Sequence, residues 1–157
     1  MLKEVNEKIP CFVQAHSMGC LCITTMIINN PTLNFAGCIL GSPFIGFGKE
    51  KKVTRFKRMM ILVLKNYLDE LPLNGIGCHM HLCRDKAYYT NAILYNQNKA
   101  GSFSSGAIIN SMIESCEDVN KNAKDYKIPT LCFLAGQEKV VSNEATKDFL
   151  KNSGVPA

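Results

Sequence analysis

The pentapeptide Ala15-His16-Ser17-Met18-Gly19 holds a serine with a small residue two positions before it and another two positions after it. This spacing is typical of a sharp turn from a strand into a helix, because small flanking residues let the two elements pass closely. A serine at such a turn can attack a carbonyl carbon, and the amide N–H of Met18 would stabilise the resulting oxyanion. His16 adjoins the serine where neighbouring side chains diverge, so we predict a packed structural histidine and not a catalytic base. The alternative is a small-residue turn with an ordinary polar serine.

The elements that would position this turn are predicted on both sides of it. Residues 11–15 form a short apolar run after Pro10, which indicates a buried strand. Residues 18–30 carry apolar side chains at helical spacing, and Pro31 ends that pattern. Residues 35–40 form a second apolar run before a Gly-Ser-Pro turn. Strand, helix and strand in this order predict a parallel βαβ unit.

The same alternation returns near the end of the chain. A helix is predicted over residues 104–119, because five apolar side chains fall on one face of it: Ile108, Ile109, Met112, Ile113 and Cys116. A third buried strand is predicted over 130–135, followed by a helix over 144–151 that Gly154 is placed to end. The predicted fold class is therefore α/β, with a mostly parallel sheet and flanking helices.

The composition favours a globular protein with a real core, since 46% of the 157 residues are hydrophobic and 20% are charged. The net charge of +5 is scattered apart from one cluster, which argues against nucleic acid as a partner. The eight cysteines lie mostly in apolar runs and indicate reduced core thiols. The amino terminus lacks an apolar signal region and no run reaches bilayer length, so we expect a cytoplasmic protein, soluble or peripheral to membranes.

Residues 44–98 break the α/β alternation and are predicted to be an insertion. A basic cluster over 49–58 directly precedes the apolar run 59–64. The residues alone leave two interpretations open, a solvated charged face beside an ordinary buried helix, or a lid that contacts membranes peripherally. The run Cys78-His79-Met80-His81-Leu82-Cys83 invites a zinc site, but its spacing differs from paired metal knuckles, so we expect no metal and no cofactor.

Three sequence phrases resemble the monoacylglycerol lipase and lysophospholipase branch of the α/β hydrolases, the serine aminopeptidase S33-like family. They are the elbow His16–Gly19, the phrase Phe35-Ala36-Gly37-Cys38-Ile39-Leu40-Gly41-Ser42-Pro43, and Leu82-Cys83-Arg84-Asp85. The resemblance runs from about Pro10 to Asn152. It implies a partial α/β-hydrolase fold with core residues 1–43 and 99–157 and an inserted helical cap over 44–98. It also implies a serine hydrolase that cleaves carboxylic esters of single-chain lipids through an acyl-enzyme, with Ser17 as the nucleophile.

The same resemblance assigns the catalytic acid to Glu138, within Gln137-Glu138-Lys139-Val140-Val141-Ser142-Asn143. Asp148 is a weaker substitute, and a plain surface carboxylate is the alternative. The base histidine of this fold follows the acid, yet the histidines are His16, His79 and His81. We therefore expect an internal fragment, a truncated gene product or a degenerate copy. The alternative function is a catalytically inactive scaffold whose protein partners cover its sheet edges.

Overall fold

The structure, a computed structural model, describes residues 9–48, 72–73 and 104–155 of the chain. The chain divides into two compact units, Met1–Gly48 with Ser115–Ala157, and Lys49–Glu114. In the second unit, strands β3 (Pro72–Leu73) and β4 (Ser104–Ser105) pair antiparallel. Helix α5 (Gly106–Lys121) begins in the second unit and ends in the first. Residues 44–48 lie in the first unit, although the predicted insertion begins at residue 44.

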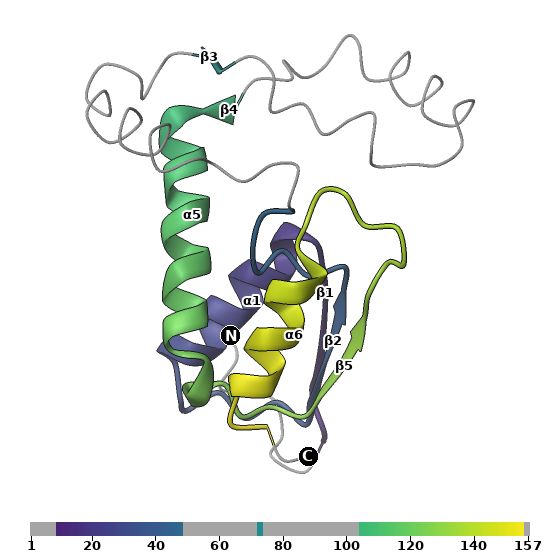
Figure 1. Cartoon of the computed structure of the whole chain (residues 1–157). Helices are drawn as coiled ribbons and strands as arrows, with labels where there is room; N and C mark the ends of the chain where they lie inside the picture. Colours follow the sequence, from purple (N-terminus) through teal and green to yellow (C-terminus); the bar gives the residue numbers. More distant parts are fainter. Residues whose placement is uncertain (1–8, 49–71, 74–103, 156–157) are drawn as a thin grey trace, which may run out of the picture. The chain divides into compact units, whose positions relative to one another are not determined.

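The first unit is built on a three-stranded parallel sheet in the order β1-β2-β5 (Figure 1). The strands are β1 (Phe12–His16), β2 (Gly37–Gly41) and β5 (Thr130–Phe133). His16 pairs with Gly41, and Gly41 pairs with Phe133, so the carboxyl ends of all three strands lie at one edge. Both the βαβ unit and the α/β fold class predicted from the sequence are thereby confirmed.

Helices α1 (Met18–Asn29) and α6 (Asn143–Asn152) lie on the same side of this sheet (Figure 1). The core between α1 and the sheet centres on Cys20, Cys38 and Leu40, which are almost fully buried. The partly buried side chains packed against them are Val13, Ala15, Ile23, Ile128 and Cys132. Burial of each large aliphatic side chain stabilises the fold by about 1.5–3 kcal/mol.

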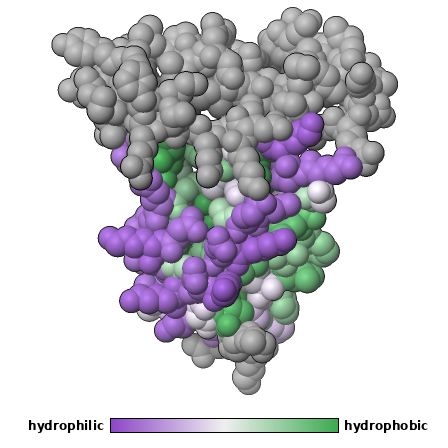
Figure 2. Space-filling model, in the orientation of Figure 1, coloured by the Kyte–Doolittle hydropathy of each residue, from purple (hydrophilic) through white to green (hydrophobic). Residues whose placement is uncertain are grey.

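The opposite face of the sheet is exposed. Phe12, Leu131 and Phe133 are 63%, 56% and 59% exposed, and no helix of the described residues covers them. Figure 2 shows hydrophobic surface on the side of the molecule where the sheet lies, and a largely hydrophilic surface over α6. His16 shares this face with Phe12, because side chains two apart on a strand point the same way. It is exposed, so the prediction of a packed histidine is wrong.

Two further expectations differ from the structure in their detail. Ile108 is 53% exposed, because it lies at the margin of a buried helical stripe that includes Ile109 and Cys116. Helix α6 ends at Asn152 with an extended Ser153 as its C-cap, so Gly154 does not end it with a left-handed conformation. A Cβ on Gly154 would instead lie 2.6 Å from the carbonyl oxygen of Lys124, and the glycine therefore permits a close backbone approach.

None of the helices among the described residues combines the length and the apolar character needed to cross a bilayer.

Candidate active site

Ser17 connects β1 directly to α1 in an unusual backbone conformation, with φ 51° and ψ −121°. Its amide donates to the carbonyl oxygen of Gly41 at 2.9 Å. Its carbonyl oxygen accepts from the amides of Cys20 at 3.0 Å and Phe44 at 3.1 Å. These backbone bonds hold Ser17 in a region that costs about 1–3 kcal/mol for a residue with a side chain. The sharp strand-to-helix turn predicted at this serine is therefore present.

The hydroxyl of Ser17 makes no capping hydrogen bond, although Ser17 is the N-cap residue of α1. The amide of Met18 belongs to the first turn of α1, where N–H groups have no acceptor within the helix. No acidic side chain lies in this first turn, so the positive end of the helix is left uncompensated. This helix end can therefore stabilise negative charge beside the Ser17 hydroxyl.

The two small residues around the turn lie at ordinary contact distance. A Cβ added to Gly19 would lie 3.9 Å from the Cβ of Ala15. The small residues let α1 pack closely against β1. The space at Gly19 would also accommodate an alanine.

Glu138 follows β5 in a turn and is half-buried. Its Oε1 accepts from the amide of Val140 at 2.8 Å and from the amide of Val141 at 3.2 Å. The side-chain amide of Asn143 donates to the carbonyl oxygen of Ala135 at 2.8 Å and closes the loop that contains Glu138. A carboxylate held by two backbone N–H groups has a defined direction, which a free surface carboxylate lacks.

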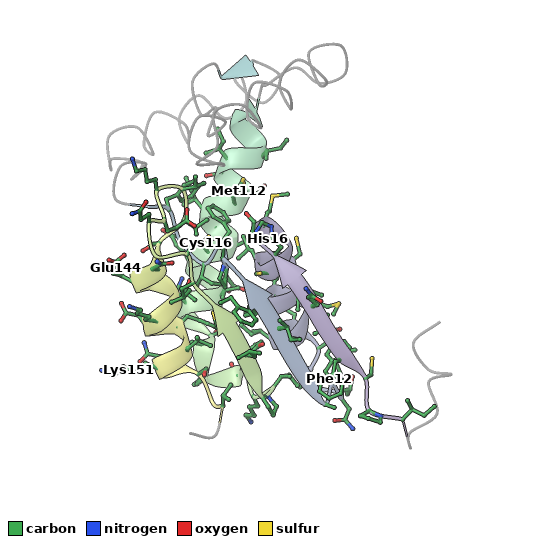
Figure 3. All side chains as sticks on the ribbon, turned by 90° about the vertical axis from the view of Figure 1, so that its right-hand side faces the viewer. Phe12, His16, Met112, Cys116, Glu144 and Lys151 are labelled. Carbon is green, nitrogen blue, oxygen red and sulfur yellow. The ribbon has the colours of Figure 1, made fainter. Side chains whose placement is uncertain are left out.

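The sheet topology brings the Ser17 and Glu138 turns to the same edge. Ser17 follows β1 and Glu138 follows β5, which are parallel strands on either side of β2. In Figure 3, His16 marks the end of β1 at this edge, and Phe12 lies at the opposite end of the strand. Asp148, the weaker substitute for the acid, lies exposed within α6.

Four thiols near the sheet, those of Cys20, Cys38, Cys116 and Cys132, are held in the protonated form by burial. Burial raises the pKa of Cys20 to about 11 and that of Cys116 to about 12, and it also raises the pKa of Cys38 and of Cys132. All four thiols are therefore protonated near neutral pH. Cys20 and Cys38 are free and buried, as predicted for core thiols, whereas Cys22 is exposed.

No group of three or more metal-binding side chains gathers within residues 9–48, 72–73 and 104–155. Several sequence features lie outside the described residues: the basic cluster 49–58, the apolar run 59–64, Cys78–Cys83 with His79 and His81, and Leu82–Asp85. The expectations of a lid and of a membrane contact, and the expectation that Cys78–Cys83 holds no metal, therefore stay predictions.

Comparison with known proteins agrees with the fold. Residues 1–156 match the sequence family described as serine aminopeptidase, S33. A monoacylglycerol lipase from Paleococcus ferrophilus superposes with a TM-score of 0.75 at 20% identity, covering 93% of this chain and 55% of the lipase.

A soluble variant of monoglyceride lipase from Saccharomyces cerevisiae, solved with a substrate analogue, superposes with a TM-score of 0.69 at 16% identity. That match covers 95% of this chain and 51% of the lipase, so the chain spans about half the length of either lipase. No curated protein matches the sequence. The family match over nearly the whole chain, together with the shared fold, shows that the protein belongs to the serine aminopeptidase S33 family of the α/β hydrolases.

Proposed function

We propose that this protein is a serine hydrolase that cleaves carboxylic esters of single-chain lipids, with Ser17 as the nucleophile. The hydroxyl of Ser17 attacks the acyl carbonyl of a monoacylglycerol or lysophospholipid, and the serine proton passes through the base to the leaving alcohol oxygen as the ester bond breaks. Water then hydrolyses the acyl-enzyme and releases the fatty acid. The amide of Met18 and the positive end of α1 stabilise the oxyanion of the tetrahedral intermediate.

The observation that carries this proposal is the backbone of Ser17, with φ 51° and ψ −121° at a junction between strand and helix. A helix that needed only an N-cap would place its serine in extended backbone and use the hydroxyl to accept from the first turn. Ser17 does neither. Its strained conformation leaves the hydroxyl available at the carboxyl edge of the sheet.

In the same proposal, Glu138 orients the base histidine. The two backbone amides that donate to its Oε1 fix the carboxylate, and its turn lies at the same sheet edge as Ser17. The base follows the acid in the chain order of this fold. Because the 157 residues contain no histidine after Glu138, the proposal assigns the base to no residue of this chain.

The lipid substrate class rests on the two structural neighbours, which are named as monoacylglycerol and monoglyceride lipases. The basic cluster 49–58 beside the apolar run 59–64 supports a peripheral membrane contact of a cytoplasmic protein. Vesicles with anionic lipids should bind the chain more tightly than neutral vesicles, and equal binding to both would contradict this part of the proposal.

A fluorophosphonate probe tests the nucleophile directly. We expect the wild-type chain to be labelled on the peptide that contains Ser17, and Ser17→Ala to remain unlabelled. Labelling is followed over hours, because oxyanion stabilisation and binding alone retain only about 10³–10⁴-fold catalysis over water. An excess of monoacylglycerol should slow labelling more than an equal amount of triacylglycerol. Absence of labelling in the wild type would favour the inactive scaffold instead.

A further inference from the structure

One short loop, residues 42–48, contacts the turns of both Ser17 and Glu138. The loop follows β2, the strand between β1 and β5. It begins at Ser42, whose φ is 41° and whose amide donates to the carbonyl oxygen of Phe133 at 2.8 Å. The amide of Phe44 then donates to the carbonyl oxygen of Ser17 at 3.1 Å. The strained serine is therefore held in part by this loop.

The other end of the loop binds the turn that contains Glu138. The amide of Gly48 donates to the carbonyl oxygen of Val140 at 3.1 Å, and the carbonyl oxygen of Gly46 accepts from the amide of Ser142 at 2.9 Å. The amide of the same Val140 donates to Oε1 of Glu138 at 2.8 Å. The loop is thus hydrogen-bonded to Ser17 at one end and, at the other, to Val140, whose own amide donates to the carboxylate.

Side chains of two helices secure the loop through its carbonyl oxygens. The Nδ2 of Asn120 on α5 donates to the carbonyl oxygen of Ile45 at 3.0 Å. The Oγ1 of Thr146 on α6 lies 3.4 Å from the carbonyl oxygen of Pro43. Phe44 and Ile45 are 4% and 0% exposed, so the middle of the loop is packed as well as bonded.

We propose that the loop 42–48 couples the position of the Ser17 turn to that of the Glu138 turn, and that Asn120 is the positioning residue that holds the loop. We infer the coupling from these contacts, and its effect on catalysis rests on the proposed function. The test of coupling is therefore a measurement at both ends of the loop.

Hydrogen exchange of individual amides in Asn120→Ala tests this coupling. The reporters are the amides of Phe44 on the Ser17 side, and of Gly48 and Ser142 on the Glu138 side. We expect all three to exchange about fivefold faster, which is the effect of losing one net hydrogen bond. Labelling of Ser17 by a fluorophosphonate should slow by roughly threefold or more, because small misplacements of a nucleophile are costly.

Asn122→Ala is the matched control. Asn120 and Asn122 each donate to a group four residues earlier, the carbonyl oxygen of Cys116 and the Oδ1 of Asp118. Asn120 differs in its additional bond to the loop. The control should leave the three amides and the labelling rate within about twofold, the range expected for a surface substitution.

The amides of Ala36 and Cys38 report on general loosening, because they are bonded at the opposite end of the sheet. If Asn120→Ala accelerates them equally, Asn120 only stabilises the fold and the proposal is wrong. Acceleration of Gly48 and Ser142 without Phe44 would also overturn it. If the exchange pattern is as expected but wild-type Ser17 is never labelled, the coupling stands and the proposed function fails.

A second pair of variants covers the case in which Asn120→Ala does not fold. Thr146→Val removes a buried hydroxyl near the loop, and Thr24→Val removes an equally buried one that bonds only within α1. The Phe44 amide should exchange faster in Thr146→Val than in Thr24→Val. Equal exchange in the two variants would contradict a loop held by α5 and α6.

Discussion

Ser17 and Ser142 are both N-cap residues of helices that lie on the same side of the sheet, yet they use their hydroxyls differently. Ser142 has extended backbone, φ −94° and ψ 109°, and its Oγ accepts from the amide of Ala145 at 3.1 Å. Ser17 has a positive φ and makes no capping bond. The hydroxyl of Ser142 therefore stabilises its helix, whereas that of Ser17 remains free for chemistry at the expense of backbone strain.

The difference arises from how each helix is connected to the sheet. Ser17 alone separates β1 from α1, so the chain must reverse within one residue. Residues 134–142 separate β5 from α6, and this longer connection lets Ser142 adopt an ordinary capping geometry. In this protein, the length of the connection therefore distinguishes the serine that caps its helix from the serine that does not.

The largest expected effect is on reactivity. Ser17→Ala should abolish fluorophosphonate labelling while it changes the free energy of unfolding by less than about 0.5 kcal/mol, since no hydrogen bond of the side chain is lost. Ser142→Ala should keep the labelling of Ser17. Probe labelling and urea denaturation of both variants measure these effects. Labelling that persists in Ser17→Ala would show that the probe does not react with Ser17.

The next effect concerns the carboxylate of Glu138, in the connection that ends at Ser142. Glu138→Ala should lower the free energy of unfolding by about 1–3 kcal/mol, because the amides of Val140 and Val141 lose their acceptor. Glu138→Gln keeps an acceptor oxygen, so it should lower the free energy of unfolding clearly less than Glu138→Ala does. Urea denaturation distinguishes the two, and equal losses would show that the amides do not need this oxygen.

Glycine substitutions measure the strain at the two serines. Ser17→Gly should raise the free energy of unfolding by about 1 kcal/mol, because glycine adopts a positive φ without steric cost. Ser142→Gly should lower the free energy of unfolding by roughly a few tenths of a kcal/mol, which is the cost of replacing a serine N-cap by glycine. Urea denaturation measures both changes in the free energy of unfolding, and opposite signs for the two variants would support the comparison. A lower free energy of unfolding in both variants would mean that Ser17 is not strained.

The smallest effect at ordinary pH comes from the thiols under the Ser17 turn. Burial holds the pKa of Cys20 at about 11 against an ordinary value of 9.0, so the folded state keeps a proton that the unfolded state releases. Stability from this group is fully present below pH 9 and is lost as the pH rises through about 11. The urea midpoint should fall between pH 8 and pH 11, and it should fall less steeply with pH in Cys20→Ala than in the wild type. Cys22→Ala changes an exposed thiol, so the midpoint of this control should fall as steeply as that of the wild type.

Periodicity and turn residues predicted much of the fold correctly. The runs before and after Ser17 became β1 and α1, because burial of alternating or helically spaced apolar residues is a local property of the chain. The same signals failed for His16 and Ile108, whose exposure depends on what covers a sheet face or the margin of a helix. The assignment of Glu138 as the acid came from resemblance alone and stays a prediction, since a carboxylate in a turn has no periodic signal of its own.

The sequence did not predict the contact between Asn120 and the loop 42–48. Asn120 and Ile45 are 75 residues apart in the chain, and an asparagine near a helix end predicts only a local cap. The sequence by itself determined β1, β2, β5, the helices beside them and the candidate serine in its strained turn, because short-range patterns encode these features. Only the tertiary structure decided how that strain is held, since the hydrogen bonds of Ser17 with Gly41 and Phe44 join it to distant parts of the chain.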